Sequence, residues 1–261
     1  MFKEWAERRF DEAVLRSRQF GLHRGLRPEG KPHFNQLIKD YKEGKQILFY
    51  KYIHVLDGFD YRSNIHGLEN LEKIKDQPIL IVANHPYEDP LKGGHCQRIL
   101  INHNVYNITQ KEVGWLFRED KISPEYLMRK RFLRQSSLIP VRDDDPETSR
   151  TLIRQAFRNK DTIGINPEGD GNKTLLRGLP KAGQLILLSA RSNYNIVCVA
   201  TEFKNGVFFI AFDEPLDSQL IKDAAANGST DNKDFLWQTI SDYAMAIIAK
   251  HLSEKRRGYY S

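Results

Sequence analysis

Short apolar runs that alternate with helical stretches constrain the fold of this chain more than any other feature. The run "ILIVA" at 79–83 is apolar on both faces, as in a strand covered from both sides. Strands are expected at 63–68, 78–84, 136–141, 161–168, 195–203 and 206–213, and helices at 91–104, 124–134, 146–158, 180–192 and 234–253. This order predicts an α/β fold with a mixed, largely parallel sheet covered by helices. The last two strands predict a hairpin across "KNG".

The first 60 residues have a different pattern. A helix is expected over residues 3–20, then a Gly/Pro-rich connector, then a second helix over about 35–55. We therefore expect an N-terminal helical segment, 1–60, before an α/β domain, 61–261.

Charge and composition narrow the class of partner. The chain has 40 Lys+Arg against 34 Asp+Glu, a net charge of +6, which favours acidic partners in general. No recognition-helix, RNP-like or zinc-finger pattern accompanies that charge, so nucleic acid is not expected. The apolar runs are far shorter than the ~18 to 20 residues of a membrane span. Cys96 and Cys198 stand alone without metal-ligand spacing, which is typical of a reduced, cytoplasmic protein with no metal site.

The segment "NHPYED" follows the most apolar strand. A histidine acts as a general base near neutral pH when a carboxylate orients its ring, and Asp89 and Glu88 follow His85 within four residues. A structural alternative is that Asn84 and Asp89 cap a helix while His85 makes one hydrogen bond. The segment alone does not separate the two interpretations.

Two further strands end in polar residues. "LIPVRDDD" delivers Arg142, whose planar guanidinium suits a phosphate or carboxylate, or a salt bridge to the neighbouring acids at 143–145. "INPEGDGN" ends in Glu168 and Gly169 and leads through a polar loop to a helix that begins near Lys181. A glycine there lets backbone amides approach a ligand, and the alternative is a plain strand-to-helix turn with an exposed glutamate.

Taken together, these blocks resemble the PlsC-like glycerolipid acyltransferase family, which includes lysophosphatidic acid and glycerol-3-phosphate acyltransferases. "HGLENL" and "PILIVANHP" are similar to the lead-in to the family's Asn-His-x4-Asp signature, and "LIPVRDD" to its second block. "INPEGDGN" resembles its Phe-Pro-Glu-Gly-Thr-Arg block, "LPKAGQLILLSA" its Phe-Lys-x-Gly helix, and "NIVCVATEF" a later strand. The resemblance covers about residues 63–213.

The resemblance implies transfer of a fatty acyl group from acyl-CoA or acyl carrier protein to a hydroxyl of a glycerolipid or lysolipid. No bound cofactor is implied, since the thioester is a co-substrate. By resemblance, His85 takes the proton of the hydroxyl, Asp89 orients it, and Arg142, Glu168 and Gly169 bind the polar head of the acceptor.

Two positions depart from the family pattern. The family places its acid at position 90, which is Pro90 here, so that Asp89 stands one residue early. The family's Thr-Arg is Asp170-Gly171, and Lys173, Arg177 and Lys181 are the candidates to replace the missing arginine. An acid at 170 favours an acceptor head group other than a simple phosphate.

Membrane contact is expected to be peripheral, on the cytoplasmic face. "MRKRFLRQ" at 128–135 and the helix over 3–20 combine cations with large apolar side chains, which suits either anionic lipid or an acidic carrier protein. Each is equally compatible with an ordinary solvated helix. Two other functions stay open: a non-catalytic lipid-binding relative, and a thioester hydrolase that uses the same base on water.

Overall fold

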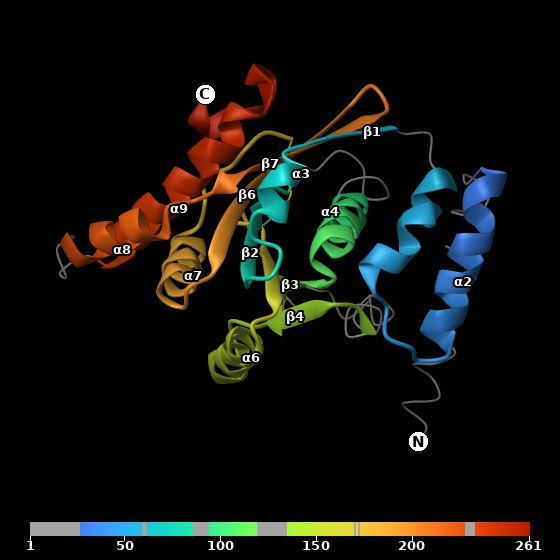
Figure 1. Cartoon of the computed structure of the whole chain (residues 1–261), viewed down its shortest axis with the longest axis horizontal. Helices are drawn as coiled ribbons and strands as arrows, with labels where there is room; N and C mark the ends of the chain where they lie inside the picture. Colours follow the sequence, from blue (N-terminus) through green and yellow to red (C-terminus); the bar gives the residue numbers. More distant parts are fainter. Residues whose placement is uncertain are drawn as a thin grey trace.

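A computed structural model describes residues 27–58, 62–85, 94–118, 135–169, 171, 173–227 and 233–261. Within these ranges seven strands form one sheet in the order β1-β7-β6-β2-β5-β3-β4 (Figure 1). The strands are β1 (Arg62–His66), β2 (Ile79–Ala83), β3 (Val113–Arg118), β4 (Leu138–Val141), β5 (Thr162–Ile165), β6 (Asn195–Lys204) and β7 (Val207–Pro215). The expected α/β class with a mixed, largely parallel sheet is confirmed.

Five neighbouring strands of the sheet run in the same direction. β6, β2, β5, β3 and β4 pair in parallel, so their carboxyl ends lie at the same edge. β7 is antiparallel to β6, and β1 is parallel to β7. Asn205 and Gly206 connect β6 to β7 with φ of 50° and 77°, the left-handed conformation that a two-residue hairpin turn requires. The hairpin across "KNG" is thereby confirmed.

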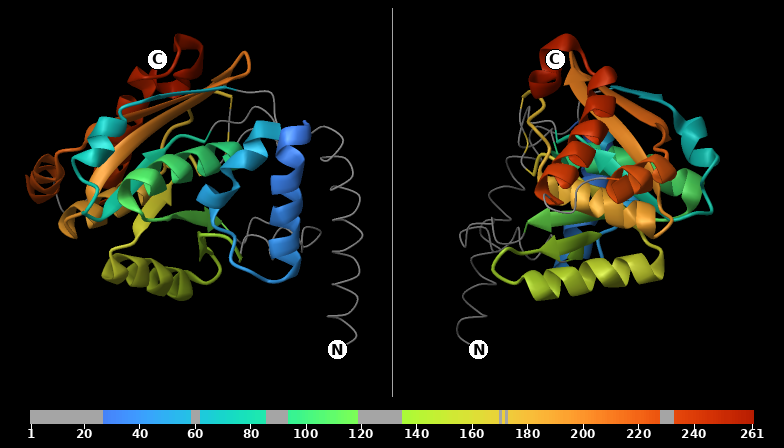
Figure 2. Two further views of the ribbon diagram at one scale, coloured as in Figure 1. Left: turned by 45° about the vertical axis from the view of Figure 1, so that its right-hand side comes forward. Right: turned by 90° about the vertical axis from the view of Figure 1, so that its left-hand side faces the viewer.

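Helices cover both faces of the sheet (Figures 1 and 2). Their bounds are η1 (Pro28–Gly30), α2 (Lys31–Lys42), η2 (Phe49–Gly58), α3 (Leu68–Glu72), α4 (Gly94–Thr109), α6 (Pro146–Asn159), α7 (Pro180–Arg191), α8 (Ser218–Asn227), α9 (Lys233–Lys250), η4 (Glu254–Arg256) and η5 (Gly258–Tyr260).

The side chains of β2 alternate between the two faces. Leu80 and Val82 join a core with α6, α7, α8 and α9, whereas Ile79, Ile81 and Ala83 join a second core with α3, α4 and η2. Because successive residues of a strand point to opposite faces, a strand buried on both sides must be apolar throughout. That requirement explains the run "ILIVA".

The second predicted helix, over 35–55, is wrong as one element. α2 ends at Lys42, Gly44 follows with φ of 72°, and η2 begins at Phe49. A glycine in the left-handed conformation is a common end of a helix. The prediction also missed β3, α3 and α8. The helices expected over 3–20 and 124–134 lie outside the described residues.

Residues 27–58 pack directly on the α/β domain. η2 contributes Phe49 and Leu56 to the core that contains α4. Ile47 donates its backbone N–H to the carbonyl oxygen of Gln135 at 2.6 Å. The boundary expected near residue 60 stays a prediction. Across the described ranges, no helix has both the length and the apolar character that crossing a bilayer requires.

Candidate active site

The carboxyl ends of three neighbouring strands form the candidate site. β2 lies between β5 and β6, and all three are parallel. His85 follows the end of β2 by two residues, and Glu168 follows the end of β5 by three. Sites in open α/β sheets collect where strands end at such an edge. Two of the sequence blocks are thus brought to the same place.

Asn84 fixes the end of β2 to β6. Its side-chain oxygen accepts the backbone N–H of Thr201 at 2.7 Å and the Thr201 hydroxyl at 3.2 Å. Its side-chain nitrogen donates to the Thr201 carbonyl oxygen at 2.9 Å. Asn84 is 5% exposed, so these bonds are made in a site that excludes most water. The side chain of Asn84 thus extends the hydrogen bonding between β2 and β6 past the last residue of β2. It also fixes the position of the backbone at the start of His85.

Glu168 connects His85 to a second loop. One carboxylate oxygen, Oε2, accepts the backbone N–H of His85 at 2.7 Å. The other oxygen, Oε1, accepts the backbone N–H of Leu176 at 3.0 Å. The carboxyl group therefore bridges two segments that are about 90 residues apart along the chain. The surface-turn alternative for Glu168 is wrong, since the residue is 6% exposed.

Burial changes the protonation of this carboxyl group. Loss of solvation raises the pKa of Glu168 to about 7, although the two backbone N–H bonds favour the ionised form and act in the opposite direction. Near neutral pH Glu168 therefore exists in both protonation states. A carboxyl group poised in this range beside a candidate base is characteristic of catalytic sites and also of buried structural carboxyls.

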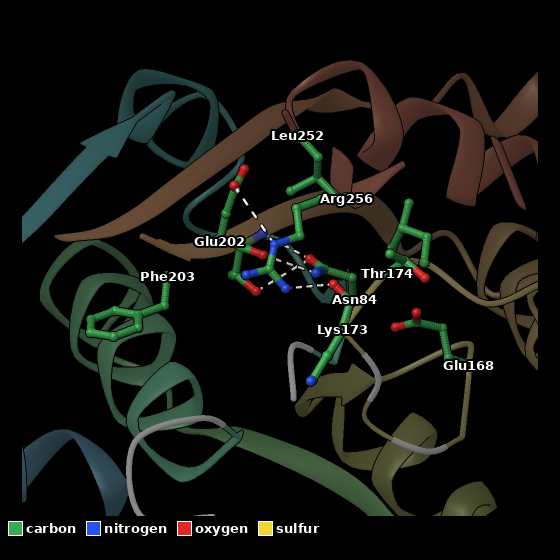
Figure 3. Close-up of a pocket in the computed structure, with 10 residues that line it drawn as sticks. Asn84, Glu168, Lys173, Thr174, Glu202, Phe203, Leu252 and Arg256 are labelled. Carbon is green, nitrogen blue, oxygen red and sulfur yellow. Dashed lines mark hydrogen bonds and ion pairs between the residues drawn. The ribbon is translucent and has the colours of Figure 1, made fainter. Parts of the chain in front are cut away.

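A small recess opens beside Glu168 (Figure 3). Its volume is about 10 Å³, room for roughly one water molecule. The recess combines polar, charged and apolar side chains from the ends of β2, β5 and β6, the loop after Glu168 and the C-terminal residues. They are Asn84, Glu168, Lys173, Thr174, Leu175, Thr201, Glu202, Phe203, Leu252 and Arg256. Glu168 and Lys173, both expected at the acceptor site, thus line one recess.

Arg256 and Glu202 are site residues that the sequence did not reveal. Glu202 accepts the backbone N–H and the hydroxyl of Ser253 at 3.0 and 2.7 Å. Arg256 donates from Nη1 to the carbonyl oxygen of Lys173 at 2.5 Å, and its Nε lies 3.9 Å from Glu202. Figure 3 shows Arg256 reaching across the recess. The cationic "KRR" near the C-terminus was the signal, but nothing local indicated where it would pack.

A buried cation, Arg98, also lies next to the site. It is 8% exposed, donates to the side-chain oxygen of Asn166 at 3.2 Å, and lies 5.7 Å from the ring of Trp115. Asn166 donates in turn to the carbonyl oxygen of Ala83 at 2.8 Å. Arg98 therefore stabilises the segment in which β2 ends. A single arginine within the apolar helix "CQRILI" was its sequence signal.

Arg142 and Lys181 belong to a different cluster, at the ends of β3 and β4. Arg142 forms a bidentate pair with Asp144, at 2.9 and 2.7 Å. Asp143 contacts Arg118 at 2.7 Å and Lys181 at 3.1 Å. The salt-bridge alternative for Arg142 is therefore what the structure contains. Its role in binding an acceptor stays a prediction.

The remaining expected residues divide between described and undescribed positions. Gly169 has φ of 76°, and a Cβ atom there would lie 2.9 Å from the Leu179 side chain. The left-handed conformation favours glycine at this position, whereas the Leu179 side chain is 45% exposed and has room to move aside. Asp89, Glu88 and Asp170 lie outside the described residues, so the carboxylate partner of His85 stays a prediction.

Comparison of the sequence with protein-family models and with curated proteins gave no match. Within the described ranges, no group of His, Cys, Asp and Glu side chains could hold a metal ion. Cys198, also within those ranges, is a buried free cysteine. The site so far consists of a half-buried histidine, a buried carboxyl group and a recess with nearby cations. Such a set can accept and return a proton and can contact an anionic or hydroxyl-bearing ligand.

Proposed function

We propose that this protein is an acyltransferase that moves a fatty acyl group from acyl-CoA or acyl carrier protein to a hydroxyl of a glycerolipid or lysolipid acceptor. His85 is the general base. The enzyme acts as a cytoplasmic protein that contacts the inner face of the membrane, where its acceptor and product reside.

The hydrogen bond between the His85 N–H and Glu168 carries this proposal. It joins the histidine block to the Pro-Glu-Gly block at 2.7 Å, although the two are 83 residues apart. In the family that these blocks resemble, both serve one site. An unrelated chain with two chance motifs has no reason to bring them into contact. The raised pKa of Glu168, about 7, adds a group that can exchange protons near the base.

The chemistry needs one proton acceptor and no covalent enzyme intermediate. His85 takes the proton of the acceptor hydroxyl while the oxygen attacks the carbonyl carbon of the thioester. The C–S bond then breaks, the ester forms, and the departing sulfur takes the proton back from His85. Asp89 orients the imidazole, and Lys173 and Arg142 attract the charged part of an acceptor.

Turnover of a thioester tests the proposal directly. Purified protein is mixed with acyl-CoA or acyl carrier protein and with glycerol 3-phosphate, lysophosphatidate or another lysolipid, and both free thiol and acylated product are measured. His85→Ala is expected to lower kcat by about 100- to 10,000-fold, the usual contribution of a general base. His251→Ala is the matched control, because His251 is a partly exposed histidine that pairs with Asp213 at 3.0 Å.

The products separate the three functions. Equal amounts of free thiol and acylated acceptor support transfer. Free thiol with free fatty acid and no acylated acceptor indicates a hydrolase. If every combination of donor and acceptor leaves the thioester intact while lysolipid still binds, the protein is a lipid-binding relative. Turnover that survives His85→Ala removes His85 from the mechanism.

A further inference from the structure

We propose that the C-terminal segment 253–261 holds the candidate site in its geometry, and that Tyr260 and Gly258 are positioning residues for His85. They act through the loop 173–179 and Glu168. The task given to His85 rests on the proposed function, whereas the mechanical connection rests on contacts within the described residues alone.

The loop 173–179 depends on outside contacts for its shape. No helix or strand is present within it, and the helix α7 begins after it, at Pro180. Leu175, within this loop, is nevertheless 3% exposed and belongs to the core formed with α6, α7, α8 and α9. A loop without regular hydrogen bonds needs partners elsewhere for its buried backbone groups. The C-terminal segment supplies them.

Two backbone hydrogen bonds clasp Leu175. Its N–H donates to the carbonyl oxygen of Arg256 at 2.9 Å, and its carbonyl oxygen accepts the N–H of Tyr259 at 3.1 Å. Gly258 lies between these two residues with φ of 52°, and a Cβ atom there would lie 2.3 Å from the Leu175 oxygen. A side chain at 258 must therefore push the two segments apart. The clasp requires glycine.

Tyr260 fixes the far end of the same loop. Its hydroxyl accepts the backbone N–H of Gly178 at 3.0 Å and donates to Asp242 of α9 at 2.7 Å. Asp242 also receives the guanidinium of Arg177 at 2.8 Å. The loop is thus held between α9 and the C-terminal segment, and one phenol hydroxyl joins the two.

The connection then continues into the site. Leu176, the residue after the clasp, donates its N–H to Oε1 of Glu168, and Oε2 of the same carboxyl group accepts the N–H of His85. Displacement of Leu175 and Gly178 moves Leu176, which removes one of the two bonds that orient Glu168. A carboxyl group that is free to rotate no longer fixes the backbone of His85. Geometry at a reacting centre is sensitive to displacements of about 1 Å.

Amide hydrogen exchange tests the connection without a substrate. In Tyr260→Phe and in Gly258→Ala, the amides of His85 and Leu176 are expected to exchange about tenfold faster, because each variant removes bonds that hold the loop. Tyr259→Phe is the matched control: it changes the neighbouring tyrosine, which is 58% exposed, and should leave both rates unchanged. The pKa of Glu168, followed by carboxyl-carbon NMR, is expected to rise in Tyr260→Phe, since a donor to the ionised form is weakened.

Steady-state kinetics compare the wild-type protein with Tyr260→Phe and Tyr259→Phe. Tyr260→Phe is expected to lower kcat about tenfold with KM for the acyl donor unchanged, whereas Tyr259→Phe keeps both. The proposal is overturned if the His85 and Leu176 amides and the pKa of Glu168 are the same in all variants. It is also overturned if exchange accelerates equally in α4, which would indicate general destabilisation. Absence of turnover in the wild-type protein counts against the proposed function alone, because exchange and titration still decide the role of the segment.

Discussion

Polar residues follow the strands at two places in the sheet, but their contacts differ. One place is the ends of β2 and β5, and the other is the ends of β3 and β4. At β2 and β5, Asn84 and Glu168 are nearly inaccessible and each accepts backbone N–H groups. At β3 and β4, Arg142 pairs with Asp144 while Asp143 joins Arg118 to Lys181, all at exposed or partly exposed positions. The buried cluster is held by hydrogen bonds to backbone groups, and the exposed cluster is held by ion pairs between side chains.

Burial decides how much the loss of a polar contact costs. A buried polar group whose partner is lost costs free energy, because water cannot replace the bond. An exposed ion pair costs little to break, because water and salt replace it. We therefore expect substitutions in the buried cluster to lower the free energy of unfolding strongly, and substitutions in the exposed cluster to lower it little. Substitutions at four places in the two clusters test that contrast, and their expected effects decrease from Asn84 to Arg142 and Asp144.

Asn84→Ala should produce the largest loss of stability. The change leaves the backbone N–H and carbonyl oxygen of Thr201 buried without their partners, which costs roughly 3 kcal/mol of unfolding free energy. Urea denaturation at pH 7 measures it. A loss below about 1 kcal/mol would mean that water enters the site and replaces the amide.

Glu168 should make stability depend on pH. Its pKa is about 7 in the folded protein against 4.5 in the ordinary state, so the folded protein binds the proton more tightly. The resulting stabilisation is complete below pH 4.5 and is lost as the pH rises through about 7. The full difference is on the order of 3 kcal/mol.

Glu168→Gln isolates this contribution. The variant cannot ionise, so the part of the slope that belongs to Glu168 disappears between pH 4.5 and about 7. Urea denaturation at several pH values, with wild type and variant compared at each, measures the difference. Parallel curves for the two proteins would show that the carboxyl group titrates as in the unfolded chain.

Asp143→Ala should cost less than 1 kcal/mol, roughly, although it breaks two ion pairs at once. The partners, Arg118 and Lys181, remain accessible to water. The loss should shrink further in ~1 M NaCl, since salt screens exposed charges. Asn84→Ala is the comparison, because the hydrogen bonds of a buried, uncharged side-chain amide are insensitive to salt. A loss that equals that of Asn84→Ala would contradict the contrast between the two clusters.

Arg142 and Asp144 should show the smallest effect on folding, about 0.5 kcal/mol or less for either alanine variant. Their effect on substrate distinguishes the two interpretations of Arg142. If Arg142 binds the acceptor, Arg142→Ala raises KM for a phosphate-bearing acceptor and Asp144→Ala lowers it, because the guanidinium is released from its pair. Unchanged KM in both variants would remove Arg142 from acceptor binding.

Local sequence was sufficient for much of the sheet. The β6–β7 hairpin followed from "KNG". The strands expected over 78–84 and 161–168 are present as β2 and β5, although β5 ends at Ile165, three residues earlier than expected. β3 was missed although "VGWLFR" is rich in apolar and aromatic residues, since it lies close after a long helical stretch. The single helix expected over 35–55 failed because the apolar pattern continues past Gly44, where the backbone adopts the left-handed conformation.

The site was predictable in its position more than in its contacts. His85 and Glu168 were identified as candidates, and they are hydrogen-bonded to one another. Which atoms meet was not evident, because the bond joins a backbone N–H to a side chain. Arg98, Glu202 and Arg256 were missed, since each reaches the site through packing against elements far away in the sequence.

Local sequence sufficed to locate most of the strands and the β6–β7 turn, since apolar periodicity and glycine conformation act over a few neighbouring residues. Only the tertiary structure decided which polar residues became buried and paired. Glu168 and Arg142 both follow a parallel strand. Residues 173–179, beyond Glu168, are hydrogen-bonded to the C-terminal segment, whereas Arg142 follows the edge strand β4 and pairs with Asp144. Burial and partners depend on segments that meet only after folding, and no local pattern encodes that meeting.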